Sequence, residues 1–202
     1  MKQKQITSTT ATTVSESSVS IDGFKSRFGI RYVTRAAIIA ALYVVLTLVM
    51  WEYSYMALQV RVSEALCVLP LLFPEAVPGL FVGCILANLI VTGGQALDVV
   101  AGSLTTLFAA YLSMKIGYFR PAIKSAKYWL GLIPPVLLNA VIVGTVVLYL
   151  YGFSGFGIEE SHAWKYLPYS MLTVGAGELI SVYGLGTLMY MALGKLPNGI
   201  YR

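Results

Sequence analysis

The chain has 202 residues, of which 57% are hydrophobic and only 11% are charged. A soluble domain has about 45–50% apolar and about 25% charged residues, so this composition excludes a water-soluble domain and predicts that most of the chain faces lipid. One bilayer crossing needs about 20 apolar residues, which leaves no room for a large catalytic domain beside a handful of crossings. The net charge of +5 follows the flanks of the apolar runs, which argues against nucleic-acid binding.

The N-terminal stretch differs from the rest of the chain. Half of the first 20 residues are Ser or Thr, and no apolar run occurs among residues 1–23. Such a stretch cannot bury enough apolar surface to fold. We therefore predict a disordered Ser/Thr-rich tail over residues 1–30 and an integral membrane domain over residues 31–202.

From Thr34 onward the apolar runs predict an all-α membrane protein with a bundle of six transmembrane helices. Pro74 and Pro78 mark one turn between helices, and Gly93 and Gly94 mark another. The expected helices cover residues 34–50, 58–73, from Pro78 to about 92, 98–116, 129–150 and 167–193. The second run is short for a crossing and carries two charged residues, so a re-entrant or tilted segment is the alternative.

The distribution of basic residues orients the bundle. Twelve of the 14 Lys and Arg residues fall on the N-terminal flank, in the loop between the fourth and fifth helices, or at the C-terminal end. With six crossings these three regions lie on one side of the membrane, whereas Arg61 and Lys165 lie on the other. Because cytoplasmic loops carry the excess of Lys and Arg, we expect both termini to be cytoplasmic.

Several polar residues fall within the apolar runs, where they usually mark a functional cavity. Counting about 1.5 Å per residue places most of them near the outer surface and puts Asn139 and Glu178 at the same depth, roughly 16 Å. The inner halves carry few polar side chains, which indicates a pocket open to the outside rather than a pore. Glu178 is the leading candidate, because its own helix has no basic residue. The candidates are Glu178, Asn139, Asn88, Arg61, Glu64 and Asp98.

Most of these residues also have a structural interpretation, which the sequence leaves open. Arg61 and Glu64 share one helix face and can pair with each other. Asp98 can serve as the N-cap of its helix. Asn88 and Asn139 can bridge neighbouring helices.

Aromatic residues gather in the expected outer loops. They form either an interfacial belt or a lid that stacks on a flat heterocyclic ligand. They are Trp51, Tyr53, Tyr55, Phe153, Phe156, Trp164 and Tyr166.

Small residues form a strip at the cytoplasmic end of the first helix. Ala36, Ala37, Ala40 and Ala41 make two overlapping pairs at a spacing of four residues, which lets another helix approach closely. The strip serves either packing inside the bundle or docking of a partner.

The residues that membrane-embedded enzymes need are missing from the expected helices. The single histidine, His162, falls in an outer loop, and only Asp22 and Asp98 supply aspartate. Neither an HExxH cluster nor a Walker A sequence occurs. We therefore expect no enzyme activity, cofactor or metal. Cys67 and Cys84 lie in apolar runs and are expected to be packed thiols.

Four segments of the chain are TRAAIIAALYVVLT, LQVRVSEALCVLP, PEAVPGLFVGCILANL and DVVAGSLTTLFAAYLS. They resemble the queuosine-precursor (QueT) transporter family, substrate-binding S components of energy-coupling-factor (ECF) importers, and the similarity extends over about residues 34–193. The resemblance implies a multi-pass protein of the bacterial cell membrane that captures its substrate from outside. It also implies a separate transmembrane coupling subunit, which would dock on the alanine strip, and two ATPase subunits.

The resemblance further implies a 7-deazaguanine base as the substrate: queuine or its 7-aminomethyl or 7-cyano precursor. Glu178 can accept hydrogen bonds from the N1–H and 2-amino groups of such a ring, while Asn139 and Asn88 can read its other heteroatoms. Glu64 or Asp98 can meet an exocyclic ammonium, and Trp164 can stack on the ring. Another vitamin-like heterocycle stays possible, as does a stand-alone secondary transporter, although we find no inverted repeat.

Overall fold

The computed structural model describes residues 29–50, 60–93, 95–117, 120–148 and 164–195, and these residues form helices and short connections without any strand. The chain divides into two units, Met1–Thr34 and Arg35–Arg202. Of the first unit, only Gly29 and the first turn of a helix are described. The tail predicted over residues 1–30 thus lies outside the described residues except for its last two.

The helices follow the expected order along the chain. Two stretches that were predicted as single helices are each divided into α-helical and π-helical parts. The elements are α2 (Ile30–Val49), the 3₁₀-helix η1 (Val62–Leu71), α4 (Ala76–Val91), α5 (Ala96–Gly117), α6 (Ala126–Gly131), α7 (Ile133–Leu138), the π-turn η2 (Asn139–Val143), α8 (Gly144–Val147), α10 (Leu167–Glu178), the π-helical segment η5 (Leu179–Leu185) and α11 (Gly186–Gly194).

Four of the described helical stretches are long and apolar enough to cross a membrane. They are Ile30–Val49, Ala96–Gly117, Ala126–Val146 and Trp164–Gly194. This finding confirms the prediction of an all-helical membrane protein. The two remaining helices, η1 and α4, are apolar but shorter. At about 2 Å per residue the ten residues of η1 extend over only about 20 Å, less than the hydrocarbon core of a bilayer. Six full crossings therefore stay a prediction.

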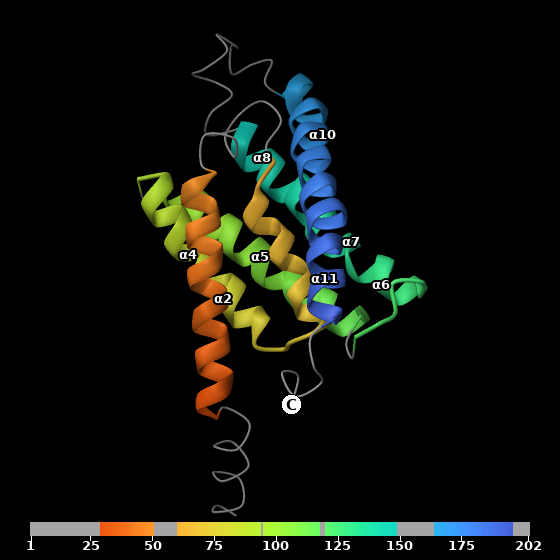
Figure 1. The fold of residues 1–202 in the computed structure, drawn as a ribbon. Coiled ribbons are helices and arrows are strands. Elements are labelled where there is room, and N and C mark those ends of the chain that lie inside the picture. Colours follow the sequence, from red (N-terminus) through yellow and green to blue (C-terminus); the bar gives the residue numbers. More distant parts are fainter. Residues whose placement is uncertain (1–28, 51–59, 94, 118–119, 149–163, 196–202) are drawn as a thin grey trace, which may run out of the picture. The chain divides into compact units, whose positions relative to one another are not determined.

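The second helix differs from the expected α-helix over residues 58–73. It is a 3₁₀-helix that begins at Val62, and the preceding Arg61 has an extended backbone. Every residue from Ser63 to Leu71 is buried, as is typical of a helix that is apolar all round. Within the unit Arg35–Arg202, η1 contacts α4, α5, η5 and α11 (Figure 1). The short helix η1 thus lies among four other helical elements, at the centre of the bundle.

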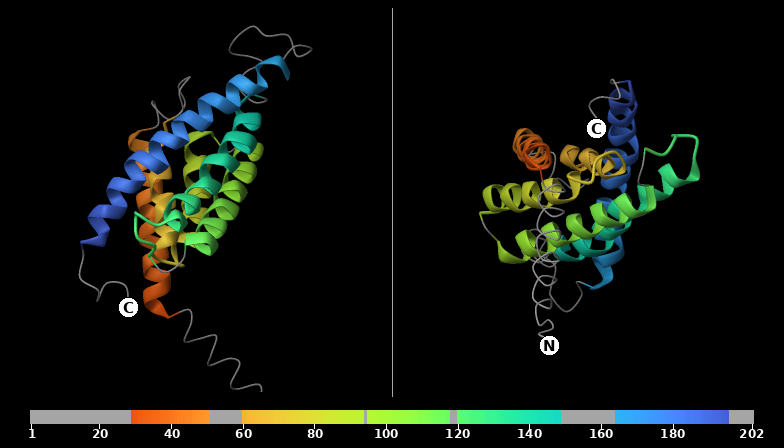
Figure 2. Two further views of the ribbon diagram at one scale, coloured as in Figure 1. Left: turned by 90° about the vertical axis from the view of Figure 1, so that its right-hand side faces the viewer. Right: turned by 90° about the horizontal axis from the view of Figure 1, so that it is seen from below.

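The last two candidate spans each contain a π-helical segment. In the fifth stretch, Pro134 and Pro135 follow a break at Leu132, and η2 begins at Asn139. Prolines cause such a break because they have no N–H for the helical ladder. In the sixth stretch, η5 begins directly after Glu178, and Figure 2 shows α10 and α11 continuing as one rod beside α7 and α8. Short π-helical segments inside α-helices are rare and often occur at functional sites.

Two glycines of α4 allow a close approach of α2. A Cβ atom on Gly79 would lie 2.7 Å from the carbonyl oxygen of Ala36, and one on Gly83 would lie 2.8 Å from Cβ of Tyr43. Both distances are too short for non-bonded atoms. The backbones of α2 and α4 therefore meet at a contact that only glycine permits.

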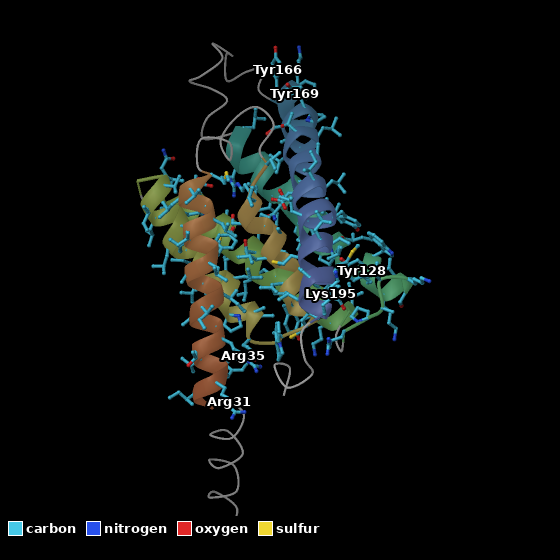
Figure 3. All side chains as sticks on the ribbon, viewed as in Figure 1. Arg31, Arg35, Tyr128, Tyr166, Tyr169 and Lys195 are labelled. Carbon is cyan, nitrogen blue, oxygen red and sulfur yellow. The ribbon has the colours of Figure 1, made fainter. Side chains whose placement is uncertain are left out.

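The two ends of the unit Arg35–Arg202 differ in side-chain character. Figure 3 shows Arg35 and Lys195 at one end and Tyr166 and Tyr169 at the other. At the basic end, Arg35 Nη1 lies 2.8 Å from Glu75 Oε1 and forms a salt bridge with it. Arg35 and Lys195 thus lie at the end of the unit that is opposite Tyr166 and Tyr169 (Figure 3).

Replacement of Gly83 by alanine should loosen the contact between α2 and α4. The added methyl group overpacks the contact, so we expect a loss of about 1–3 kcal/mol in unfolding free energy, measured in detergent by circular dichroism. Gly184→Ala is the control, because nothing lies within 4 Å of a Cβ at that position. Equal stability of the two variants would contradict the close approach.

Candidate functional site

Glu64 lies at the centre of the buried polar groups. Its side chain is only 1% exposed. The hydroxyl of Tyr43 donates a hydrogen bond to Oε1, and the thiol of Cys67 donates one to Oε2 at 2.9 Å. The 3₁₀ geometry of η1 explains the second bond, because side chains three residues apart are eclipsed in such a helix. Both oxygens of Glu64 therefore have a donor within the protein.

Glu178 is just as deeply buried but has an open hydrogen-bonding atom. Glu178 and Asn139 are 2% and 3% exposed, and the amide of Asn139 faces the Glu178 carboxylate. Nevertheless, Glu178 Oε2 and Asn139 Nδ2 have no hydrogen-bond partner among the described residues. Buried polar atoms are nearly always paired. The two residues thus present one acceptor and one donor side by side.

The charges of Glu64 and Arg61 act on Glu178, and that of Glu178 acts on Cys67. These residues come from α2, η1 with its N-cap, η2 and α10. We call this group the buried polar cluster, and it consists of Tyr43, Arg61, Glu64, Cys67, Asn139 and Glu178. Four of the predicted site residues, Arg61, Glu64, Asn139 and Glu178, therefore meet in one place.

Close packing of the fifth and sixth helices holds Asn139 against Glu178. The hydroxyl of Ser170 donates to the carbonyl oxygen of Gly144 at 2.7 Å. One turn further along, a Cβ on Gly175 would lie 3.2 Å from Cβ of Ala140. Small residues on both sides of Asn139 thus allow the helices to cross closely, which fixes the position of the amide relative to the carboxylate.

Asn88 and Asp98 form a second buried group between α4 and α5. Asn88 Nδ2 donates to the backbone oxygen of Asp98 at 3.3 Å and lies 3.5 Å from Sγ of Cys84. Asn88 therefore bridges two helices, one of the interpretations that the sequence left open. The group borders on the buried polar cluster, because the charge of Glu64 acts on Cys84.

Trp164 lies apart from the cluster. Its side chain is 70% exposed, and Lys165 Nζ lies 5.9 Å from its ring centroid. The 14 residues between Trp164 and Glu178 correspond to about 20 Å along a helix, so the structure does not bring the two side chains together. Of the other loop aromatics, Tyr166 is exposed, and the remaining ones lie outside the described residues, as does His162.

The predicted alanine strip divides between two faces of α2. Ala40 is buried and Ala36 half-buried, and both lie against the glycines of α4. Ala37 and Ala41 are exposed. One pair therefore packs inside the bundle, and the other pair is accessible on the outer surface of the helix.

Sequence reasoning missed Tyr43 and Cys67. Within the apolar runs the site candidates are charged and amide side chains, and Cys67 is expected to be only a packed thiol, because a tyrosine or a cysteine there is usually part of the core. One signal was available, since Cys67 follows Glu64 by three residues. None of the described residues form a group of three or more His, Cys, Asp or Glu that could hold a metal ion.

The described helices are apolar and surround a buried polar cluster, in which some atoms have no hydrogen-bond partner among the described residues. The chain is therefore a helical membrane protein with a polar centre. The family model described as QueT transporter matches residues 33–195. The chain belongs to this transporter family, which confirms the resemblance noted in its sequence. It is thus a membrane transport protein with a small-molecule substrate. No curated protein and no solved structure gives a significant match.

Replacing Tyr43 by phenylalanine should destabilise the protein. The change keeps the ring but leaves Oε1 of the buried Glu64 without this donor, which costs about 1–3 kcal/mol of unfolding free energy. Thermal unfolding in detergent measures the loss. Tyr169→Phe, which removes a hydroxyl from an exposed side chain, serves as the matched control. If both variants unfold at the wild-type temperature, the hydroxyl of Tyr43 does not support Glu64.

Proposed function

We propose that the chain is the substrate-binding S component of an ECF importer in the bacterial cell membrane. It captures a 7-deazaguanine base, namely queuine or one of its 7-aminomethyl and 7-cyano precursors, from outside. A transmembrane coupling subunit and two ATPase subunits on other chains supply the energy. The transporter family and the arrangement of Glu178 and Asn139 support this proposal.

The proposed substrate rests on one observation, the two atoms of the buried polar cluster that have no hydrogen-bond partner among the described residues, Glu178 Oε2 and Asn139 Nδ2. A guanine-like ring presents the O6 acceptor, the N1–H donor and the 2-amino donor along one edge. Glu178 is a carboxylate that can accept from both N–H groups, and Asn139 Nδ2 can donate to O6. Because Glu178 Oε2 and Asn139 Nδ2 lack partners among the described residues, the ring would satisfy atoms that are otherwise buried without one.

The surroundings of this pair suit a rigid binding site. The contacts at Gly144 and Gly175 fix both helices, and the π-helical segments begin at Asn139 and directly after Glu178. A preorganised donor and acceptor lose little conformational freedom when the ligand binds, which favours high affinity. Glu64 already has two donors and would help to hold the cluster in place.

The topology that we propose has six membrane-crossing helices with both termini in the cytoplasm. The position of Arg35 and Lys195 at one end of the unit supports this orientation (Figure 3). The coupling subunit would then approach α2 from its outer surface. Ala37 and Ala41 are the exposed small residues there, and small residues let two membrane helices approach closely.

Glu178→Gln should weaken the binding of 7-aminomethyl-7-deazaguanine by about 100-fold, because charge-assisted hydrogen bonds each contribute about 1.5–3 kcal/mol. Calorimetric titration of the purified protein measures the affinity. Glu75→Gln is the control, since Glu75 is a buried carboxylate that pairs with Arg35. Unchanged affinity in Glu178→Gln would remove this residue from the site.

Tryptophan at Ala37 or Ala41 should abolish uptake and leave ligand binding within about twofold, because a bulky side chain blocks the close approach of another helix. Uptake is measured in cells that produce the coupling and ATPase subunits. Leu42→Trp, at an exposed position on the neighbouring face, should transport normally. Wild-type uptake by Ala41→Trp would contradict docking here, and uptake without the partner subunits would indicate a secondary transporter.

A further inference from the structure

The connection between α5 and α6 carries charge of one sign. Between Asp98 and Glu159 the sequence contains four basic residues and no acidic one. Three of the four are exposed, and we call them the basic corner: Lys115, Lys124 and Lys127. A surface on which charges of one sign gather attracts ions of the opposite sign. The basic corner is therefore suited to an anionic partner.

The basic corner lies where two candidate membrane spans end. Lys115 is in the last turn of α5, and Lys127 is the second residue of α6, with which the next candidate span begins. The two backbones meet here. A Cβ atom on Gly117 would lie 3.4 Å from the carbonyl oxygen of Lys127, and one on Gly131 would lie 3.6 Å from Cα of Gly117. Because the ends of membrane spans lie at the level of the lipid headgroups, the lysines are placed to meet them.

Hydrogen bonds hold the connection between the two spans in place. The N–H of Arg120 donates to the carbonyl oxygen of Leu71 at 3.1 Å, and the hydroxyl of Tyr190 donates to that of Pro121 at 2.8 Å. The side chain of Ser125 caps α6. The backbone that carries the lysines is thus anchored to η1 and α11. A bound anion then needs to order only the lysine side chains, which reduces the entropic cost of binding.

A stacked aromatic pair adjoins the basic corner. The rings of Trp129 and Tyr183 lie 5.8 Å apart at an angle of 16°, and the hydroxyl of Tyr183 donates to the backbone oxygen of Trp129 at 3.0 Å. Trp129 follows Lys127 by two residues and is 41% exposed, and the apolar Leu130 and Ile133 beyond it are exposed as well. Tryptophan and tyrosine next to lysine at the end of a span are typical of the membrane–water interface.

We infer that the basic corner binds the phosphate of an anionic phospholipid, whose acyl chains lie against Trp129 and Leu130. The lysines complement the charge of the headgroup. The adjoining exposed apolar side chains complement the part of the lipid that a soluble anion lacks. A zwitterionic lipid also contains a phosphate, but its own cation competes with the lysines. This site is separate from the buried polar cluster and does not depend on the proposed substrate.

Trp129 itself can report which lipid contacts it. The chain has three tryptophans, so the variant Trp51→Phe/Trp164→Phe retains Trp129 alone. This protein is reconstituted into bilayers of phosphatidylglycerol and phosphatidylcholine, of which one or the other has brominated acyl chains that quench tryptophan fluorescence on contact. We expect phosphatidylglycerol to bind at least about fivefold more tightly, which corresponds to the contribution of one lysine near an anionic lipid surface. Added salt should reduce this preference.

Exchanges of lysine test whether the basic corner supplies the preference. In the single-tryptophan protein, Lys124→Gln/Lys127→Gln should reduce it to less than about twofold, whereas Lys124→Arg/Lys127→Arg, which keeps the charge, should retain it. Lys165→Gln is the control. It removes an exposed lysine next to Tyr166, which lies at the opposite end of the unit (Figure 3), and should leave the preference at Trp129 unchanged.

The outcomes separate a lipid site from the alternatives. Equal binding of the two lipids at Trp129 would overturn the inference and leave the basic corner to a protein partner. Full preference in Lys124→Gln/Lys127→Gln would show that these lysines do not recognise the headgroup. Relief of the quenching by millimolar inorganic phosphate would indicate a site for a soluble anion and would also overturn the inference. None of these results bears on the binding of a deazaguanine base.

Discussion

Two hydrogen bonds to the Glu64 carboxylate organise the centre of the bundle. A carboxyl group buried among apolar helices requires hydrogen-bond partners, because an unpaired polar group there is strongly destabilising. Tyr43 supplies one donor from α2, so α2 must lie close to η1. Cys67 supplies the other from η1 itself, and the 3₁₀ form brings it directly above Glu64. The glycines of α4 then allow α2 to come close enough for the Tyr43 hydroxyl to reach.

The two central carboxylates are equally buried but differ in what surrounds them. Each oxygen of Glu64 accepts a hydrogen bond from a side chain of the protein, whereas Glu178 lies near Asn139 and keeps an oxygen without a hydrogen-bond partner among the described residues. This difference separates a residue that supports the fold from one that is available to a ligand. Burial alone would not have distinguished them.

Much of the fold follows from the sequence, because apolar runs of spanning length have few alternatives in lipid. Residues 98–116 and 167–193 were predicted within two residues of the observed helices. Counting along two helices predicted that Asn139 and Glu178 lie at the same depth, and in the structure the amide of Asn139 faces the Glu178 carboxylate. The 3₁₀ form of η1 could not be predicted from the sequence, since an apolar run of this length fits either helix type and burial on all sides decides between them. The sequence also does not predict which alanines of α2 pack inside the bundle and which are exposed. All four occur at the same spacing, and only contact with Gly79 and Gly83 distinguishes them.

The π-helical segment η5 changes the helical phase of the last span. A wider turn accommodates an extra residue, so the side chains that follow are rotated relative to those before it by up to the 100° of one α-helical residue. The exposed pairs Leu179–Ile180 and Gly184–Leu185 accordingly lie five residues apart in this segment, rather than three or four. One helical period applied to the whole span would therefore combine two exposed faces that are rotated relative to each other, and it would describe neither of them correctly. The exposed surface of this span can therefore be identified only when the residues before and after η5 are treated as separate helices.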